Sequence, residues 1–353
     1  MRIVDVLVVG LGPAGSAAAA AAARAGARVL GADKRHEIGL PVQCAEFIPR
    51  PLGRYAQGDG VLRQTIAGMW SVLPSGAQTH TEFPGLMIDR AAFDQALAAE
   101  AHGAGAALAT ATQLVHVDAL RHQATLRSAA GEQTVNYRLL VAADGPHSTV
   151  AKALGLPELE TVHTRQYTVP LQVPYADTDI WLAPDYPGGY AWLFPKGGCA
   201  NLGLGADKHL QADLKQPLDA LHRRLVAAGR VGEAILCRTG GAIPVGGLRE
   251  RLVVNDVLFA GDAAGFTHPI SGAGIAAAVV SGDRAGRAAA EYLSGAKAAL
   301  DDFEEDMRDQ FEASLARAAA RRRQMLDGWR GAEAKQDGFH RRGWIAFPEY
   351  FAA

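Results

Sequence analysis

Short apolar runs and an alanine-rich stretch alternate at the start of the chain. Residues 3–9 (IVDVLVV) are apolar and rich in β-branched side chains, which predicts a buried parallel strand. Residues 16–24 are mostly alanine and predict a helix that ends at Gly26. Residues 27–33 (ARVLGAD) predict a second strand. We therefore expect the chain to begin with a strand–helix–strand unit.

In the middle of the chain, a mixture of predicted helix and strands gives way to a segment that predicts mainly strands. Residues 89–102 predict a helix with Asp89 as its N-cap. Shorter apolar runs predict strands at 114–118, 122–127 and 135–142. Residues 161–205 are rich in Tyr, Val, Trp and Thr and are broken by Pro and Gly, which is typical of an antiparallel sheet.

The last third of the chain returns to a strand followed by helices. Residues 252–260 (LVVNDVLFA) predict a strand, and a helix is expected after Gly272. Apolar residues recur at steps of three and four over 298–326, so this segment predicts an amphipathic helix, with an acidic start and a basic end that suit the helix dipole. No internal repeat or low-complexity linker separates these regions, which favours two interleaved domains over a tandem pair.

Composition narrows the class of protein. The 353 residues are 49% hydrophobic and 20% charged, which excludes a disordered chain and a coiled-coil rod. The formal net charge of −2 gives no global electrostatic reason to bind nucleic acid. Cys44, Cys199 and Cys237 form no C-x-x-C pair, which predicts a reduced, cytoplasmic protein without a cysteine-based metal site. No transmembrane segment is expected, since the fairly apolar stretch 263–280 contains a histidine, a proline and three glycines.

A glycine-rich motif joins the first predicted strand to the first predicted helix. Gly10–Gly15 (GLGPAG) is followed by Asp33 at the end of the second strand. In such a motif the glycines permit a tight turn, a close backbone approach to a pyrophosphate and close packing of helix on strand. The helix N-terminus faces the phosphate charge, and Asp33 can accept hydrogen bonds from a ribose. This arrangement predicts an adenine dinucleotide, with an incidental glycine-rich turn as the alternative.

A second strand–loop–helix lies far along the chain and decides between FAD and NAD. Gly261–Gly265 (GDAAG) follows its strand directly, and Gly272–Ile275 (GAGI) opens the next helix. Asp262 can therefore bond a polyol such as ribityl, and the helix N-terminus can face a pyrophosphate or the edge of a flavin ring. A glycine-rich turn capped by Asp262 is the alternative. Together the two motifs predict FAD.

Several motifs resemble a known family. The pair of glycine motifs, with Ala143–Ser148 (ADGPHS) between them, is similar to the glutathione-reductase-type FAD fold in its para-hydroxybenzoate-hydroxylase branch. Gly39–Glu46 (GLPVQCAE) resembles the P-V-x-C-[GA]-E run of geranylgeranyl reductases. Tyr190–Pro195 (YAWLFP), with Ala200–Gly205 (ANLGLG) downstream, resembles their Y-x-W-x-F-P…G-x-G signature. The chain is thereby identified as a member of the geranylgeranyl reductase family, and the last ~60 residues carry no motif that can be placed.

The resemblance implies an α/β fold. A glutathione-reductase-type, Rossmann-like FAD-binding domain is expected to be interleaved with an antiparallel-sheet substrate domain and followed by C-terminal helices. The expected boundaries are 1–63, 88–150 and 252–295 for the FAD-binding domain, 64–87 and 151–251 for the substrate domain, and 296–353 for the C-terminal helical segment.

The resemblance also implies an FAD-dependent oxidoreductase that reduces carbon–carbon double bonds of an isoprenoid-type, apolar or lipid substrate by hydride transfer from reduced flavin. Cys44 can line the site or relay a proton, or it is a small buried residue. The expected catalytic residues are Cys44, Tyr190, Trp192 and Phe194. The expected cofactor-binding residues are Gly10, Gly12, Pro13, Ala14, Gly15, Asp33, Lys34, Cys44, Ala45, Phe47, Arg90, Leu114, Asp144, Gly145, Gly261, Asp262, Gly272, Gly274 and Ile275.

Other readings of the same motifs stay open. The aromatic run Tyr190, Trp192 and Phe194 can wall a substrate pocket or belong to the core of a sheet. The fold also hosts halogenases, whose W-x-W-x-I-P run differs from this chain, and an aromatic hydroxylase or an electron-transfer flavoprotein acting on quinones is the alternative function. No second G-x-G-x-x-G marks a separate nucleotide domain, so NAD(P)H or another reductant, such as an electron-donor protein, is expected to supply electrons. Peripheral contact with the inner membrane is an open alternative to a fully cytoplasmic location.

Overall fold

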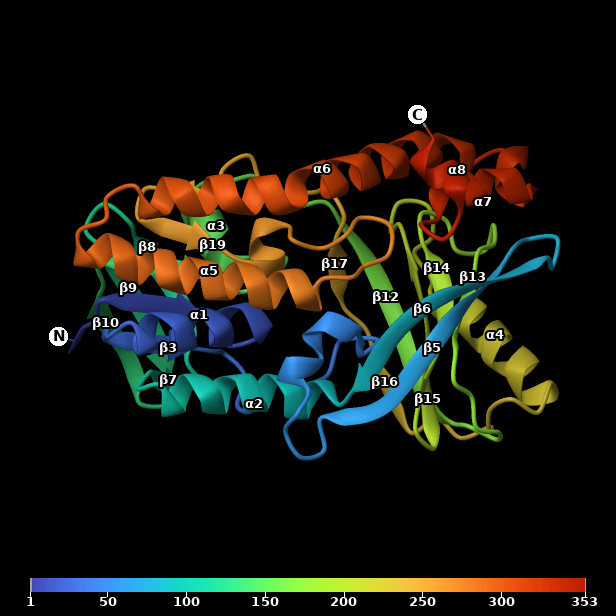
Figure 1. Cartoon of the computed structure of the whole chain (residues 1–353), viewed down its shortest axis with the longest axis horizontal. Helices are drawn as coiled ribbons and strands as arrows, with labels where there is room; N and C mark the ends of the chain where they lie inside the picture. The colour runs from blue at the N-terminus through green and yellow to red at the C-terminus, as the bar shows by residue number, and fades with distance from the viewer. Residues whose placement is uncertain (1, 353) are drawn as a thin grey trace.

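The computed structural model describes residues 2–352, and a parallel sheet forms the centre of one half of the protein (Figure 1). In sheet order its strands are β18 (Val253–Val254), β19 (Val257–Phe259), β11 (Leu139–Ala142), β2 (Val6–Val9), β3 (Val29–Ala32) and β7 (Ala107–Ala109). All neighbours are parallel except β18 and β19. Every residue of β2, β3 and β11 is buried, as expected for parallel strands that are covered on both faces.

Helices α1 (Pro13–Arg24) and α5 (Ile275–Ser294) lie side by side against this sheet (Figure 1). Two glycines of α5 allow the close approach. A Cβ on Gly282 would lie 2.0 Å from the carbonyl oxygen of Ala14, and one on Gly286 would lie 2.2 Å from that of Ala18. The order of these contacts along the two helices means that α1 and α5 run in the same direction. Their N-termini therefore open toward the same side of the protein.

A second sheet of four strands adjoins this half. Its order is β1 (Arg2–Ile3), β10 (Gly131–Asn136), β9 (Gln123–Ser128) and β8 (Gln113–Asp118). The single strand predicted over 135–142 is wrong, because the segment is divided between β10 here and β11 in the parallel sheet. At the break the N–H of Tyr137 donates to the carbonyl of His122, and that of Leu139 donates to Asp5. The backbone thus changes hydrogen-bond partners between the two sheets.

Three more elements complete this half. They are η1 (Arg50–Tyr55), α2 (Arg90–Gly103) and α3 (Thr149–Ala153). The predicted N-cap of α2 is confirmed, since the side chain of Asp89 accepts a hydrogen bond from the N–H of Ala92 at 3.1 Å. The predicted strand–helix–strand start is confirmed as β2, α1 and β3, although the helix begins at Pro13, earlier than expected.

The other half is built on a large, mainly antiparallel sheet (Figure 1). In sheet order its strands are β16 (Cys237–Thr239), β12 (Thr161–Pro170), β15 (Cys199–Ala206), β14 (Tyr190–Lys196), β13 (Thr178–Trp181), β5 (Leu62–Val72), β6 (Gln78–Ile88) and β4 (Phe47–Pro49), with β17 (Ala242–Pro244) beside β12. This confirms the antiparallel sheet predicted over 161–205, except that β13 pairs with β5 in parallel. Helix α4 (Lys215–Ala227) packs on the face that carries Ala191 and Leu193, so the alternate residues of β14 face away from α4.

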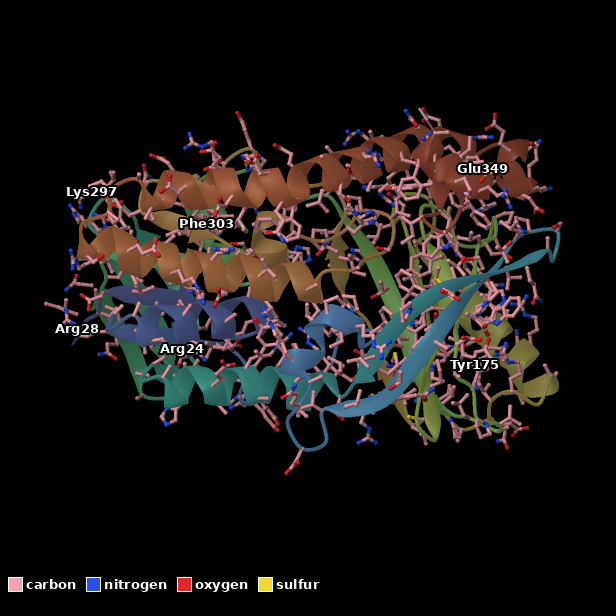
Figure 2. The ribbon with its side chains drawn as sticks, in the orientation of Figure 1. Arg24, Arg28, Tyr175, Lys297, Phe303 and Glu349 are labelled. Carbon is pink, nitrogen blue, oxygen red and sulfur yellow. The ribbon has the colours of Figure 1, made fainter. Side chains whose placement is uncertain are left out.

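The C-terminal helices bridge both halves (Figure 1). Helix α6 (Ala299–Gly328) confirms the predicted amphipathic helix, and its Phe303 belongs to the core of the first half (Figure 2). At its far end lie η3 (Ala332–Lys335), α7 (Asp337–Gly343) and α8 (Pro348–Phe351). Between the last two helices, Trp344 and Phe347 pack against Ile180 of the large sheet. Within residues 2–352, no helix is long and apolar enough to cross a membrane.

Candidate functional site

The first glycine motif forms an open turn at the start of α1. Gly10 has a φ of 91°, and a Cβ on Gly15 would lie 1.7 Å from the carbonyl oxygen of Gly10, so both positions require glycine. Gly12 is the N-cap of α1 and offers no side chain to the first N–H groups of the helix. Asp33 closes the turn, because its carboxylate accepts from the N–H of Leu11 at 2.7 Å. These first N–H groups are therefore left for an anion.

The second glycine motif lies directly beside the first. Gly261 begins the short 3-10 helix η2 (Gly261–Ala264), and a Cβ there would lie 2.8 Å from that of Ala14 at the start of α1. Asp262 accepts a hydrogen bond from the hydroxyl of Thr267 at 2.6 Å, and burial raises the pKa of its carboxyl. Gly274 caps α5 without a side-chain hydrogen bond. Two uncapped helix N-termini and the Asp262 carboxylate thus meet in one region.

Asp144, predicted to bind the cofactor, has a clear local role. It follows β11, and one carboxylate oxygen accepts from the N–H groups of Thr149 and Val150 at 2.7 and 3.2 Å, which caps α3. Its other oxygen is buried and has no partner within residues 2–352. Burial raises the pKa of this carboxyl. An orphaned buried oxygen next to the two glycine motifs is the kind of atom that a bound ligand can satisfy.

These features fit FAD. FAD needs positive helix ends for its pyrophosphate and acceptors for its ribose and ribityl hydroxyls, and the two N-termini with Asp33 and Asp262 offer both. The close packing of α1 on α5 brings the two motifs together, although about 250 residues separate them in sequence. Each motif also contains a glycine whose Cβ would clash with a neighbouring main chain or helix.

Cys44 lies on the loop before β4. Its Sγ accepts from the N–H of Glu46 at 3.2 Å, and the side chain is half-buried. Burial raises the pKa of the thiol, and the neighbouring Arg90 guanidinium partly opposes that rise. Arg90 is held by Asp94, whose carboxylate accepts from its Nε at 2.7 Å. At neutral pH the thiol therefore keeps its proton, in a position beside a fixed positive charge.

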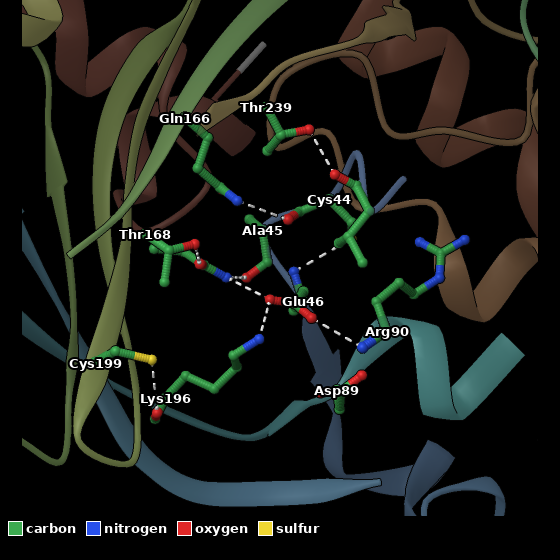
Figure 3. A network of polar contacts seen from close by, with 12 residues as sticks. Cys44, Ala45, Glu46, Asp89, Arg90, Gln166, Thr168, Lys196, Cys199 and Thr239 are labelled. Atoms are coloured by element: carbon green, nitrogen blue, oxygen red, sulfur yellow. Dashed lines mark hydrogen bonds and ion pairs between the residues drawn. The ribbon is translucent and has the colours of Figure 1, made fainter. Parts of the chain in front are cut away.

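A buried carboxylate that the sequence analysis did not single out holds this loop (Figure 3). Glu46 is 2% exposed and has a φ of 70°, which is rare for a residue with a side chain. It accepts from the N–H of Arg90 at 2.8 Å, from Lys196 Nζ at 2.5 Å and from Asn201 Nδ2 at 2.7 Å. Glu46 and Asn201 lie within the motifs, and Lys196 follows one, but their pairing across about 150 residues is visible only in the fold.

The aromatic residues of β14 face this loop. Trp192 donates from its indole N–H to Gln166 Oε1 at 3.1 Å, and Gln166 donates in turn to the carbonyl oxygen of Cys44 at 3.0 Å. Tyr190 donates from its hydroxyl to the carbonyl of Ser271 at 2.5 Å. The structure thus brings Cys44 and the aromatic run together, and it joins them to the loop after Asp262.

The other predicted residues are placed as follows. Phe47 lies on β4 with its ring centroid 6.0 Å from that of Phe194, so it belongs with the aromatic run. Leu114 is buried in the core of the first half, and Lys34 is exposed after β3. Pro13, Ala14, Ala45, Gly145, Gly272 and Ile275 lie on the two glycine motifs, the Asp144 turn and the Cys44 loop.

His268, a titratable residue near the second motif, is turned toward its own loop. Its Nδ1 accepts from the N–H of Ser271 at 3.2 Å, and its Nε2 lies 3.5 Å from the hydroxyl of Tyr350 in α8. Burial lowers the pKa of this imidazole to about 4. His268 is therefore neutral at pH 7 and ties the loop to the C-terminal segment.

Known proteins resemble both the sequence and the fold. A family model described as FAD binding domain matches residues 78–190. Digeranylgeranylglycerophospholipid reductase of Methanosarcina acetivorans is 34% identical over 330 residues, which cover 86% of this chain and 79% of that protein. A geranylgeranyl bacteriochlorophyll reductase-like protein from Thermoplasma acidophilum has a TM-score of 0.85 at 26% identity, with 95% of both chains covered.

A probable FAD-dependent monooxygenase from Pseudomonas aeruginosa has a TM-score of 0.71 at 19% identity, covering 94% of this chain and 99% of that chain, which shows a shared fold alone. The sequence identity to the reductases extends over most of both chains. The chain belongs to the family of digeranylgeranylglycerophospholipid reductases, which are FAD-dependent oxidoreductases of the geranylgeranyl reductase type.

Proposed function

We propose that this protein reduces carbon–carbon double bonds in the isoprenoid chain of an apolar or lipid substrate. The observation that carries the proposal is the run of Tyr190, Trp192 and Phe194 on one face of β14, joined to the Cys44 loop through a single glutamine. An isolated double bond offers no charge to bind, so its position depends on a dry wall of flat apolar side chains. The names of these relatives support an isoprenoid substrate.

FAD supplies the hydride when it is bound, and the residues of the chain hold and orient it. We assign the pyrophosphate to the N-termini of α1 and α5, the ribose hydroxyls to Asp33 and the ribityl hydroxyls to Asp262. The Cys44 loop and the large sheet then exclude water from the reacting face. The remaining cofactor-binding residues predicted from the sequence are part of this proposal.

The reaction also needs a proton for the second carbon of the double bond. We assign it to Cys44, because burial raises the pKa of the thiol and keeps it protonated at neutral pH. A hydride added to one carbon and the thiol proton added to the other complete the reduction. The guanidinium of Arg90 stabilises the thiolate that is left, and solvent returns the proton to it.

The electrons that reduce the flavin are expected to come from NAD(P)H or another reductant, which includes an electron-donor protein. A lipid substrate also favours a cytoplasmic protein with peripheral membrane contact. Anaerobic mixing of the FAD-loaded protein with NADPH, NADH and reduced ferredoxin, followed by absorbance of the oxidised flavin, identifies the donor. If none of them reduces the flavin within minutes, this choice of donors is contradicted. The proposed substrate is tested separately by the variants below.

Two variants test the assignment of the site. Trp192→Ala should keep its FAD and lose most of its turnover with a geranylgeranyl lipid, because the wall of the pocket is lost. Cys44→Ser is nearly isosteric and should slow reoxidation of the reduced protein by about 10²-fold or more, the usual contribution of general acid catalysis. Rates within a few-fold of the unchanged protein for both variants would refute the proposed site.

A further inference from the structure

Six aromatic rings form one continuous row through the large sheet. Consecutive ring centroids are 5.6 Å apart from Phe83 to Phe47, 6.0 Å from Phe47 to Phe194 and 6.4 Å from Phe194 to Trp192. The row continues for 5.7 Å from Trp192 to Tyr190 and for 4.8 Å from Tyr190 to Trp344. The six residues come from β6, β4, β14 and the segment between α7 and α8, so no single strand dictates the row.

Glycines shape the surface on which these rings lie. A Cβ on Gly85 would lie 2.1 Å from the ring of Phe47, and a Cβ on Gly203 would lie 2.4 Å from the indole of Trp192. Both rings therefore rest directly on the backbone of a neighbouring strand. Phe47, Phe194 and Tyr190 stay half-buried, so part of each of these side chains is accessible to a ligand.

The two ends of the row differ. Phe83 is 36% exposed, whereas Trp344 is 3% exposed and lies in the segment between α7 and α8. Trp344 is fixed in place, because its indole N–H donates to the hydroxyl of Ser71 at 3.1 Å. Tyr190 and Trp344 also line a small cavity with residues of the C-terminal helices, among them Met325, Trp329 and His340.

We propose that the isoprenoid chain of the substrate lies along this row, with its polar end outside Phe83 and its apolar end against Trp344. This inference rests on the proposed function, and it adds the direction in which the isoprenoid chain binds and a limit on the length of that chain. A row of closely spaced, mostly tilted aromatic rings suits a branched, unsaturated hydrocarbon, and Trp192, which is joined to the Cys44 loop, lies in the interior of the row. Trp344 is thus the specificity-determining residue for chain length.

The experiment compares the FAD-loaded protein with its Trp344→Ala, Trp344→Leu and Trp344→Phe variants. The probes are farnesol, geranylgeraniol and geranylfarnesol, each as the anaerobic oxidant of the dithionite-reduced protein. Dissociation constants of the fully saturated alcohols, from tryptophan fluorescence, provide a readout that needs no turnover. FAD content and thermal midpoint show which variants fold, and Trp344→Leu keeps apolar bulk in case Trp344→Ala does not.

Trp344→Ala should raise the preference for geranylfarnesol over farnesol by about 10-fold, in kcat/KM and in binding, because the chain can then enter the cavity beyond. Trp344→Leu should raise it less, and Trp344→Phe should leave it unchanged. At the other end of the row, Phe83→Ser should raise KM without changing kcat. Leu120 is an exposed residue in the first half, and the control substitution Leu120→Ser should change neither KM nor kcat.

If Trp344→Ala and Trp344→Leu fold and their preference for geranylfarnesol over farnesol is unchanged, the assignment of Trp344 is overturned. Equal KM values for Phe83→Ser and Leu120→Ser would overturn the position of the mouth. Both outcomes leave the proposed function standing as long as the unchanged protein is oxidised by prenyl alcohols. If none of the three alcohols oxidises the unchanged protein, the proposed function itself fails.

Discussion

Replacing Glu46 tests whether the Cys44 loop is held by the buried carboxylate. Its oxygens accept from Lys196 at 2.5 Å, Asn201 at 2.7 Å and the N–H of Arg90 at 2.8 Å. Glu46→Ala leaves the ammonium of Lys196, whose side chain is 14% exposed, without its counter-charge. Breaking a buried ion pair from one side costs ~3–5 kcal/mol, so we expect the free energy of unfolding to fall by about that amount.

Three further variants separate the effect of the charge from the effect of the backbone conformation. Glu46 has a φ of 70°, where a residue with a Cβ costs ~1–2 kcal/mol and glycine costs little. Glu46→Gly should therefore be ~1 kcal/mol more stable than Glu46→Ala, although both lose the same carboxylate. The pair Glu46→Gln with Lys196→Met removes both charges and should be more stable than Glu46→Gln alone.

The assay is urea unfolding followed by tryptophan fluorescence, at one fixed FAD concentration because a bound cofactor adds stability of its own. A loss of less than ~1 kcal/mol in Glu46→Ala would refute the claim that this carboxylate holds the loop. A Glu46→Gly variant that is less stable than Glu46→Ala would refute the argument from φ. Coupling near zero in the double-mutant cycle would mean that the ion pair itself contributes nothing.

Three more predictions concern FAD binding, the dependence of stability on pH, and the contact of Gly203 with the indole of Trp192. Asp262→Ala should weaken FAD binding by about 10- to 150-fold and Asp144→Ala by less, since Asp144 is occupied in capping α3; equal affinities in both variants would contradict this ranking. Burial lowers the pKa of His268 from 6.5 to about 4, so its stabilising contribution, ~3 kcal/mol at most, is complete above pH 6.5 and is lost as the pH falls through 4. His268→Gln should flatten the stability–pH curve in that window, and an unchanged slope would refute the assignment. Gly203→Ala should cost ~1–3 kcal/mol and shift tryptophan fluorescence, because the added methyl overlaps an indole, whereas Gly205→Ala has ordinary contacts and should cost less.

Much of the fold follows from local sequence pattern. The glycine spacing of 10–15, the alanine-rich run behind it and the apolar periodicity of 298–326 each specify an element through contacts within a few residues, and each forms as predicted. The segment 135–142 shows the limit of such reasoning. Its apolar pattern is continuous. However, the N–H of Tyr137 donates to the carbonyl of His122 and the N–H of Leu139 donates to the carbonyl of Asp5, and both partners are distant in sequence.

The site depends more strongly on contacts that are distant in sequence. The motifs indicate Cys44 and the aromatic run, because these residue types have recognisable spacing. No local pattern predicts that Gln166 joins Cys44 to Trp192, that Lys196 neutralises Glu46, or that Trp344 completes the aromatic row. These partners are ordinary residues on β12, on β14 and in the segment between α7 and α8, and only the tertiary fold gives them a role.

The central claim is that the reduced protein transfers hydrogen to an isoprenoid double bond without oxygen. The most direct measurement is mass spectrometry of a geranylgeranyl lipid after anaerobic incubation with the FAD-loaded, dithionite-reduced protein, with flavin absorbance followed in parallel. The account predicts that the flavin is reoxidised and that the lipid gains two hydrogens for each double bond reduced, with Cys44→Ser much slower. A flavin that is reoxidised only after air is admitted, with a lipid that is unchanged or carries an added oxygen, would contradict it.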